Sequence, residues 1–236
     1  SLADVFDNAV PVEWRRDLFD LIERTPHLDW LLVTKRIGNV RQMIPDRWSV
    51  CMPPNLWLGI TVVNQAEADR DIPKLLGLKV SVRFLSMEPL LGPVDLRFHV
   101  FSEPTGNFRT HDGKRQMELR KPVDGGLHWV IVGGESGPGA RPMHPQWARD
   151  LRDQCAEAGV PFLFKQWGEW VDCDSGPEDD ALYEGKADCW AHIDGGHHDG
   201  AMGIDFFHTH PMYRIGKKAA GRLLDGVQHD GYPSPQ

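Results

Sequence analysis

Short runs of consecutive apolar residues recur along the chain, and this feature limits its fold more than any other. The runs are continuous rather than alternating, which is typical of strands buried on both faces. Most successive runs begin about 30 residues apart, the length of a strand–helix–strand unit. They cover residues 31–33, 56–62, 82–85, 129–132 and 160–164. We therefore expect parallel strands joined by helices.

Amphipathic segments lie between these runs. Residues 12–25 and 145–158 each carry apolar side chains at helical spacing. Pro145 suits the start of the second helix, and Gly159 suits its end. Strands that alternate with helices predict an α/β fold, either a (β/α) barrel or partial barrel or a doubly wound open sheet. We favour the barrel or partial barrel.

The chain of 236 residues is long enough for a single barrel-type domain over residues 1–236. Two segments interrupt the repeat. Residues 97–127 are polar and rich in Gly, Lys and Arg, which is typical of a surface excursion or lid. Residues 169–212 are rich in Gly, Asp and His and indicate a C-terminal cap or a metal site. Residues 1–4 read like the tail of a strand, so we expect an N-terminally truncated barrel.

Charge and hydropathy argue against several classes of protein. The net charge of −8 does not provide the overall positive field of non-specific nucleic-acid binders or membrane-surface proteins, although it leaves room for a local basic cleft. No apolar run approaches the ~20 residues of a membrane helix, and no signal peptide opens the sequence. We expect a cytoplasmic protein that does not bind membranes.

The cysteines give no sign of a disulfide framework or an iron–sulfur loop. Residues 51, 155, 173 and 189 are far apart and form no CxxC pair. Cysteines and histidines that could bind zinc gather late in the chain, but no C-x2-C pair accompanies an H-x3-H pair, so we expect no metal site. This set is Cys173, Cys189, His192, His197, His198, His208 and His210.

Polar side chains follow directly after the apolar runs. If the strands are parallel, these side chains emerge at one edge of the sheet, where barrel and open-sheet enzymes bind their ligands. Charges that converge there are costly without a ligand, unless they form a network of mutual salt bridges. The set comprises Lys35, Arg36, Asn64, Ser86, Glu88, Gly133, Gly134, Glu135, Lys165, Gln166 and Trp167, with Asp4 and Asn8 joining from the start of the sequence.

Glu88 and Lys165 are the predicted catalytic residues. The proline after Glu88 disfavours helix and holds the carboxylate at the end of its strand. Lys165 follows five apolar residues, a dry setting in which the pKa of a lysine can fall and proton transfer or Schiff-base chemistry becomes available. A structural ion pair of Lys165 with Glu88 or Glu135 is the alternative.

The remaining residues are assigned to binding. Cofactor binding is predicted for Lys35, Asn64, Gly133, Gly134 and Glu135, because backbone amides near glycines can hold an anion or a cofactor's carboxylate. A simple glycine turn is the alternative.

Substrate binding is predicted for Arg36, Ser86, Arg141, Gln166 and Trp167. Arg141 can clamp a phosphate or carboxylate, or pair with Glu135. Trp167 can offer a stacking platform for a base.

Six sequence blocks resemble a known family. They are LLVTKR (31–36), WLGITVVNQ (57–65), RFLSMEPLLGP (83–93), WVIVGGESGPGARPM (129–143), PFLFKQWG (161–168) and GKKAAGRLLDG (216–226). Together they closely resemble the bacteriophage gene-product 37/68 family, and the likeness covers nearly the whole chain outside the two insertions. Members of that family typically begin with a tryptophan-rich segment and a three-cysteine motif ending in Cys-Tyr-Ala, similar to the iron–sulfur loop of radical S-adenosylmethionine enzymes.

The resemblance implies that the full-length protein is a radical S-adenosylmethionine-like barrel enzyme that uses S-adenosylmethionine and a 4Fe–4S cluster. We expect no bound cofactor in the present sequence alone. The substrate is open, and the phage association favours a nucleic acid or a partner protein. Two other functions remain open: a metal-independent barrel enzyme that acts on an anionic small molecule through Glu88 and Lys165, and a nucleic-acid-binding module that uses Lys35, Arg36 and Arg141.

Overall fold

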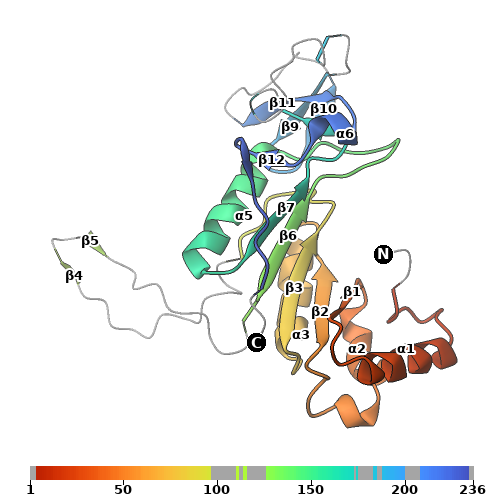
Figure 1. Ribbon diagram of the computed structural model, residues 1–236. Helices are drawn as coiled ribbons and strands as arrows, with labels where there is room; N and C mark the ends of the chain where they lie inside the picture. The colour runs from red at the N-terminus through yellow and green to blue at the C-terminus, as the bar shows by residue number, and fades with distance from the viewer. Residues whose placement is uncertain are drawn as a thin grey trace.

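A five-stranded parallel sheet forms the centre of the molecule (Figure 1). The computed structural model describes residues 4–96, 110–111, 114–115, 126–172, 174, 183–184, 188–199 and 208–233. The sheet contains β1 (Trp30–Thr34), β2 (Leu56–Thr61), β3 (Val82–Met87), β6 (Trp129–Gly133) and β7 (Phe162–Gln166). Each of the five apolar runs contributes one of these strands, so the predicted α/β fold with a parallel sheet is confirmed.

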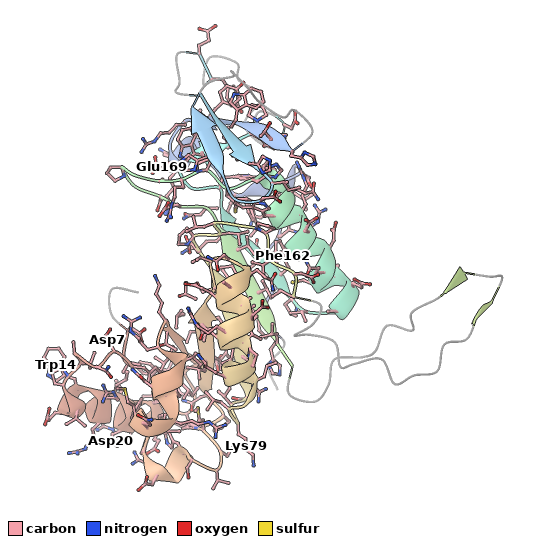
Figure 2. The ribbon with its side chains drawn as sticks, turned by 180° about the vertical axis from the view of Figure 1, so that it is seen from behind. Asp7, Trp14, Asp20, Lys79, Phe162 and Glu169 are labelled. Atoms are coloured by element: carbon pink, nitrogen blue, oxygen red, sulfur yellow. The ribbon has the colours of Figure 1, made fainter. Side chains whose placement is uncertain are left out.

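The strands lie in the order β1-β2-β3-β6-β7, which follows the chain without a reversal. Since parallel crossovers are almost always right-handed, an order that never reverses places the connecting helices on one face of the sheet. Figure 2 shows α3 (Gln65–Leu76) and α5 (Pro145–Ala158) together in front of the sheet. Over the described residues the sheet is open, and its strands do not close into a barrel.

The helices begin and end where the sequence provides the signals. Asn64 caps α3 by accepting a hydrogen bond from a backbone N–H of the first turn. Pro145 opens α5, and Gly159 ends it in the left-handed conformation at φ 66°. The other helical segments are α1 (Val12–Arg24), η1 (Ile37–Asn39), α2 (Val40–Met43), η2 (Asp46–Trp48) and α6 (Lys217–Ala220). The helices predicted over residues 12–25 and 145–158 are therefore confirmed. None of the helices described is long and apolar enough to cross a membrane.

A second, antiparallel sheet follows β7 and occupies the segment predicted as a cap. It contains β8 (Trp170–Val171), β9 (Asp188–His192), β10 (His197–Asp199) and β11 (Thr209–Arg214) in the order β10-β9-β11-β8. Two short hairpins complete the strands: β4 (Thr110–His111) with β5 (Lys114–Arg115), and β12 (Leu223–Leu224) with β13 (Val227–Gln228). Apart from β4 and β5, most of the predicted lid lies outside the described residues.

Side chains alternate between the two faces of the parallel sheet. On the helix-covered face, Leu58, Ile60, Leu85, Val130 and Phe164 are buried in the main core. A second apolar cluster lies on the opposite face and is built from Trp57, Val82, Phe84 and Trp129. This opposite face is called the inner face below.

The C-terminal segment covers one edge of the sheet. The backbone N–H of Phe164 donates to the carbonyl of His229 at 3.0 Å, and Gly231 N–H donates to the carbonyl of Phe162 at 2.9 Å. Residues 229–231 thus run beside β7 as an antiparallel partner, with an isolated bridge between Leu163 and Asp230. Two backbone groups on that edge of β7 are thereby satisfied, and Asp230 is placed in the lining of the inner face.

Candidate functional site

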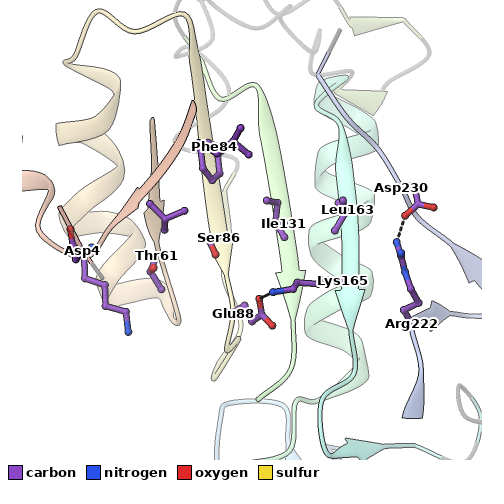
Figure 3. Close-up of a pocket in the computed structure, with 13 residues that line it drawn as sticks. Asp4, Thr61, Phe84, Ser86, Glu88, Ile131, Leu163, Lys165, Arg222 and Asp230 are labelled. Atoms are coloured by element: carbon purple, nitrogen blue, oxygen red, sulfur yellow. Dashed lines mark hydrogen bonds and ion pairs between the residues drawn. The ribbon is translucent and has the colours of Figure 1, made fainter. Parts of the chain in front are cut away.

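A cleft of about 740 Å³ lies over the inner face of the parallel sheet (Figure 3). The lining residues come from all five strands and from two flanking segments. They are Asp4, Leu31, Val33, Lys35, Thr61, Phe84, Ser86, Glu88, Ile131, Leu163, Lys165, Arg222 and Asp230. A cleft of this volume is in the range that binds cofactors and small substrates.

The side chains that the strands contribute to the cleft change from apolar to polar toward the C-terminal ends of the strands. On β3 and just beyond it, Phe84, Ser86 and Glu88 follow one another on the inner face. On β7, Leu163 and Lys165 repeat the same change from apolar to charged. Because the strands are parallel, the charged residues that the strands contribute lie together at their C-terminal ends, where parallel-sheet enzymes carry their sites.

Aromatic rings close the other end of the inner face. The ring centroids of Trp57 and Trp129 are 6.5 Å apart, and the ring of Phe84 lies 5.8 Å from that of Trp129. Tyr232 packs against both tryptophans at 5.3 and 5.0 Å, and the indole N–H of Trp129 donates to the carbonyl of Gly231 at 2.7 Å. The C-terminal segment thereby helps to close this end of the inner face with apolar side chains.

Glu88 is the centre of the polar end. Its Oε2 atom lies 2.6 Å from Lys165 Nζ, and its Oε1 atom accepts a hydrogen bond from Gln166 Nε2 at 2.6 Å. Gln166 is itself buried, and its amide also donates to the carbonyl of Gly134 at 3.3 Å. The Glu88 side chain is 19% exposed and that of Lys165 is 53% exposed. The Glu88 carboxylate is therefore held by the buried amide of Gln166, whereas the more exposed Lys165 can leave Glu88 and bind a ligand.

Asp4 and Lys35 lie on the β1 side of the same end. One Asp4 oxygen, Oδ2, accepts hydrogen bonds from Thr34 Oγ1 at 3.0 Å and from the backbone N–H of Lys35 at 2.8 Å. The other, Oδ1, accepts from the backbone N–H of Phe6 at 3.1 Å. These bonds tie the segment before α1 to the C-terminal end of β1, and the Lys35 side chain lines the cleft.

Arg222 and Asp230 form the remaining wall of the cleft and pair with each other. Neither residue was predicted to belong to the site, although Arg222 lies in the GKKAAGRLLDG segment, residues 216–226. With this pair included, the lining carries equal numbers of positively and negatively charged side chains. They are the cations Lys35, Lys165 and Arg222 and the carboxylates Asp4, Glu88 and Asp230.

Glu135 and Arg141 form a separate ion pair that does not line the cleft. Arg141 holds both Glu135 oxygens through Nε at 2.8 Å and a terminal nitrogen at 2.9 Å, and its backbone N–H adds a bond of 2.9 Å. The side-chain hydrogen bond from Arg141 holds the pKa of Glu135 below its ordinary value, against the opposing effect of burial. The geometry is that of the structural pair weighed in the sequence analysis.

The two glycines after β6 lie in different surroundings. Gly133 sits on the inner face, and a Cβ there would meet the Glu88 side chain at 3.4 Å. Gly134 donates its N–H to the carbonyl of Gln166 at 2.9 Å, and a Cβ there would lie 1.8 Å from the carbonyl oxygen of Trp167. The Gly134 amide is thus engaged within the protein, and this glycine allows the loops after β6 and β7 to touch.

A family model described as a protein of unknown function (DUF5131) matches residues 1–233. The chain belongs to this family. Comparisons with curated proteins and with solved structures gave no match. The family description assigns no activity, so the function of the DUF5131 chain is argued from the geometry of its cleft.

Besides the buried Gln166, three other predicted binding residues of the DUF5131 chain lie outside the cleft lining. Asn64 caps α3. Arg36 is half exposed, and its Nε lies 3.5 Å from Asp7. Trp167 is only 1% exposed and donates its indole N–H to the carbonyl of Leu223 at 2.7 Å. The stacking role predicted for Trp167 is therefore corrected, because its ring is packed in the core and presents no face to a base.

The three cysteines that the structure describes lie on separate parts of the DUF5131 chain. Cys51 is exposed before β2, Cys155 is buried on α5, and Cys189 is buried on β9. Burial raises the pKa of the Cys155 thiol to about 12. Cys173 lies outside the described residues. The described thiols therefore do not fit the three-thiolate set that a 4Fe–4S cluster requires.

One group of described side chains has the composition and spacing of metal ligands: Asp172, Asp174 and His210. His210 belongs to the histidine and cysteine set considered for zinc, whereas the two aspartates were missed. Neither His192 nor Cys189, both described, is part of this group. Carboxylates are so common on protein surfaces that sequence spacing gave no reason to single these two out.

Proposed function

We propose that this DUF5131 chain is a partial-barrel enzyme that binds a zwitterionic, amino-acid-like ligand in the cleft, and that the ligand is S-adenosylmethionine. The observation that carries the proposal is the position of Glu88 and Lys165 at the C-terminal ends of strands whose other cleft-lining side chains are mainly apolar. Strands that never reverse their order, with helices packed on the opposite face, favour a partial barrel over a doubly wound sheet.

The charge balance of the cleft favours a ligand with charges of both signs. Three cations and three carboxylates line it, so a polyanion would meet as much repulsion as attraction. A zwitterion can satisfy both signs at once. In the absence of ligand, Lys165 and Glu88 satisfy each other at 2.6 Å.

An amino-acid end would replace that ion pair with two others. The ligand's ammonium group would bind Glu88, and its carboxylate would bind Lys165, so neither charge loses its partner. Gln166 would keep Glu88 in place through its 2.6 Å hydrogen bond while Lys165 turns to the ligand. Gln166 is thus a positioning residue in this proposal.

The apolar wall suits the remainder of such a ligand. Leu31, Val33, Ile131 and Leu163 line the cleft together with the ring of Phe84. An adenine ring has flat faces that pack well against aliphatic and aromatic side chains. The cleft volume of about 740 Å³ accommodates a molecule of this size.

The resemblance to radical S-adenosylmethionine enzymes points to the same ligand. In those enzymes an iron–sulfur cluster supplies the electron that cleaves the cofactor. We infer no cluster-dependent reaction step for this chain, because the described cysteines lie on separate elements. What this chain's residues provide is binding and orientation: Glu88 and Lys165 fix the amino-acid end, and the apolar wall shields the ring from water.

Acid–base chemistry on a small carboxylate is a second candidate, and the contact between Glu88 and Lys165 favours it. At 2.6 Å a proton can pass between the two groups. A nucleic-acid-binding module has less support, since Trp167 is buried and the chain carries a net charge of −8.

Isothermal titration calorimetry with S-adenosylmethionine tests the proposal. We expect binding by the wild-type chain and binding at least about tenfold weaker in Glu88→Gln and Lys165→Met, since hydrogen bonds to charged groups contribute about 1.5–3 kcal/mol. Glu157→Gln, a change on an exposed part of α5, is the matched control and keeps wild-type affinity.

Absence of binding by the wild-type chain, or undiminished affinity in a folded Glu88→Gln variant, would contradict the assignment. Loss of a carboxylate ligand's binding in the same two variants, without any binding of S-adenosylmethionine by the wild type, would support the second candidate.

A further inference from the structure

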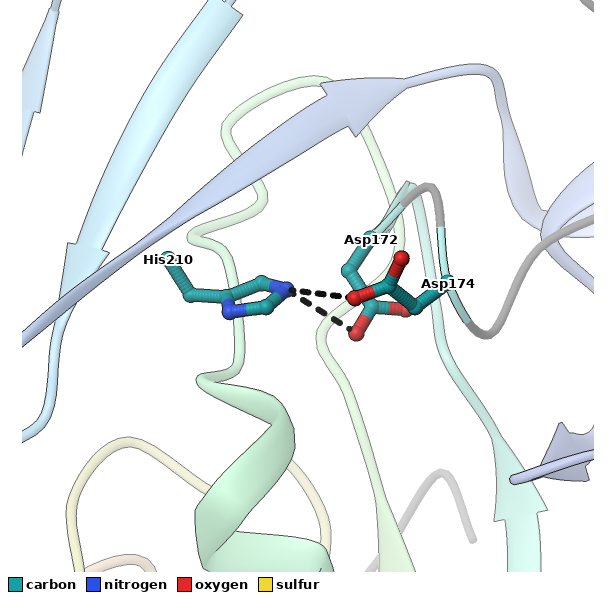
Figure 4. A group of neighbouring side chains, drawn as sticks. All are labelled: Asp172, Asp174 and His210. Atoms are coloured by element: carbon teal, nitrogen blue, oxygen red, sulfur yellow. Dashed lines mark ion pairs between the residues drawn. The ribbon is translucent and has the colours of Figure 1, made fainter.

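Two acidic side chains and one imidazole converge beside the antiparallel sheet (Figure 4). Asp172 and Asp174 follow β8 directly, and His210 lies on β11, which pairs with β8. None of the three lines the cleft described above. We propose that Asp172, Asp174 and His210 bind a divalent metal ion.

The distances between the three groups are close to those of a metal site. His210 Nε2 lies 3.2 Å from Asp172 Oδ2 and 4.0 Å from Asp174 Oδ2, and all three ligand atoms lie within 4.8 Å of one another. Ligands at about 2.0–2.1 Å from a tetrahedral Zn²⁺ are roughly 3.3 Å apart. A contraction of about 1 Å on the Asp174 side would complete the geometry.

The contraction is available because the three side chains differ in exposure. The Asp172 side chain is fully buried at 0% exposure, and that of His210 is 24% exposed. The Asp174 side chain is 72% exposed and can change its rotamer without disturbing the core. Two ligands are therefore fixed by packing, and the third can close over an ion that arrives from solvent.

The burial of the Asp172 carboxylate favours the binding of a cation beside it. A carboxylate out of contact with water requires close positive charge. The guanidinium of Arg149 lies 3.8 Å from Asp172, but it also lies 2.8 Å from Asp225, so its charge is shared. A divalent ion held by Asp172, Asp174 and His210 would place positive charge directly beside the buried carboxylate.

The ligand types indicate the class of ion. Two carboxylate oxygens and one imidazole nitrogen suit Zn²⁺ or Mn²⁺, whereas Mg²⁺ and Ca²⁺ prefer oxygen ligands throughout. Water molecules would fill the remaining positions on the exposed side. Because the ligands come from the residues just after β8 and from β11, the ion would join two neighbouring strands of the antiparallel sheet.

A second Asp–His pair in the same sheet region provides an internal control. His192 Nδ1 lies 3.7 Å from Asp194 Oδ2, and the Asp194 side chain is 84% exposed. The ring of His208 lies 6.0 Å from that of His192, but the described residues place no third ligand atom at metal-binding spacing from this pair. Asp194→Asn therefore removes a comparably exposed carboxylate beside an imidazole, without touching the proposed site.

The test measures bound metal and thermal stability in the whole chain. Chelator-treated protein is dialysed against Zn²⁺ or Mn²⁺, and the bound metal is counted by mass spectrometry for wild type, Asp174→Asn, His210→Gln and Asp194→Asn. We expect the wild type to gain roughly 5 °C in melting temperature at saturating ion. We expect Asp174→Asn and His210→Gln each to lose one equivalent of metal and this gain, and Asp194→Asn to keep both.

Equal metal content in wild type and Asp174→Asn would overturn the proposal, as would loss of metal in Asp194→Asn alone. Either result would mean that Asp172 and His210 form a simple ion pair without a metal ion. Since Asp174 is exposed, its amide variant is expected to fold, so the measurement stays informative if His210→Gln does not. The outcome is independent of ligand binding in the cleft.

Discussion

Replacing Gly134 with alanine tests how the candidate site is assembled. The added Cβ would lie 1.8 Å from the carbonyl oxygen of Trp167, where normal contact requires about 3.2 Å. Because the obstructing atom belongs to the backbone, the loops after β6 and β7 must move apart by more than about 1 Å. That movement weakens the hydrogen bonds from Gly134 N–H to Gln166 and from Glu169 N–H to Glu135, both 2.9 Å long.

The expected loss of stability follows from the weakened hydrogen bonds and the steric overlap. Each hydrogen bond contributes about 1 kcal/mol, and overpacking costs about 1–3 kcal/mol, so the free energy of unfolding should fall by roughly 3–5 kcal/mol. Urea denaturation followed by tryptophan fluorescence measures this change. Gly139→Ala is the matched control in the same loop: nothing lies within 4 Å of its added Cβ, its φ is not positive, and its stability should stay within about 0.5 kcal/mol of wild type.

A Gly134→Ala variant as stable as Gly139→Ala would refute the close approach of the two loops. A destabilised but folded variant should also bind ligand more weakly, because the buried Gln166 that positions Glu88 belongs to the displaced segment.

Three further predictions follow from individual contacts. Asn64→Ala should lower the free energy of unfolding by about 1 kcal/mol in urea denaturation, because it removes the α3 cap, and Asn64→Asp should restore it. Glu135→Gln should be less stable than wild type at pH 7. Because Arg141 holds the pKa of Glu135 below its ordinary 4.5, the difference in melting temperature between the two proteins should shrink as the pH falls through that lowered pKa. A difference that stays constant with pH would contradict a stabilising pair between Glu135 and Arg141. Iodoacetamide at pH 8 should label exposed Cys51 and spare Cys155, whose pKa is raised to about 12 by burial, as peptide mass spectrometry would show; equal labelling would contradict the packing of α5.

The parallel sheet was predictable because strands buried on both faces need continuous apolar sequence. The same reasoning placed Glu88 and Lys165 at one edge, and the structure brings them into contact. Sequence alone could not separate the two faces of each strand, since both are apolar. The inner face becomes identifiable only from register, which sets Gly59 beside Phe84 so that the ring can lie across the glycine.

The roles of single polar residues were harder to predict. Arg222 and Asp230 reach the cleft because the C-terminal segment turns back along β7, and no local pattern signals that path. Trp167 follows β7 directly and lies two residues beyond Lys165, so strand alternation alone predicts the same side for both; instead, the Trp167 ring packs 5.0 Å from the ring of Phe164 and is buried. Spacing gives a residue's place along a strand; the side to which it points requires the packed structure.

The antiparallel sheet was missed as a sheet. Its strands are short, and the segment's many Gly, Asp and His residues are typical of turns. Strand pairing there joins β8 to β11 across a long stretch of sequence, a non-local contact that no residue pattern reveals. The cluster of Asp172, Asp174 and His210 depends on that pairing, which explains why the aspartates did not stand out.

The most direct test of the proposed function is a crystal structure of the chain grown with S-adenosylhomocysteine, which shares the amino-acid and adenosine parts of S-adenosylmethionine. We predict ligand density over the inner face, with the amino-acid end between Glu88 and Lys165 and the adenine against the apolar wall. Ligand density at another site, or an empty cleft at saturating concentration, would contradict the account.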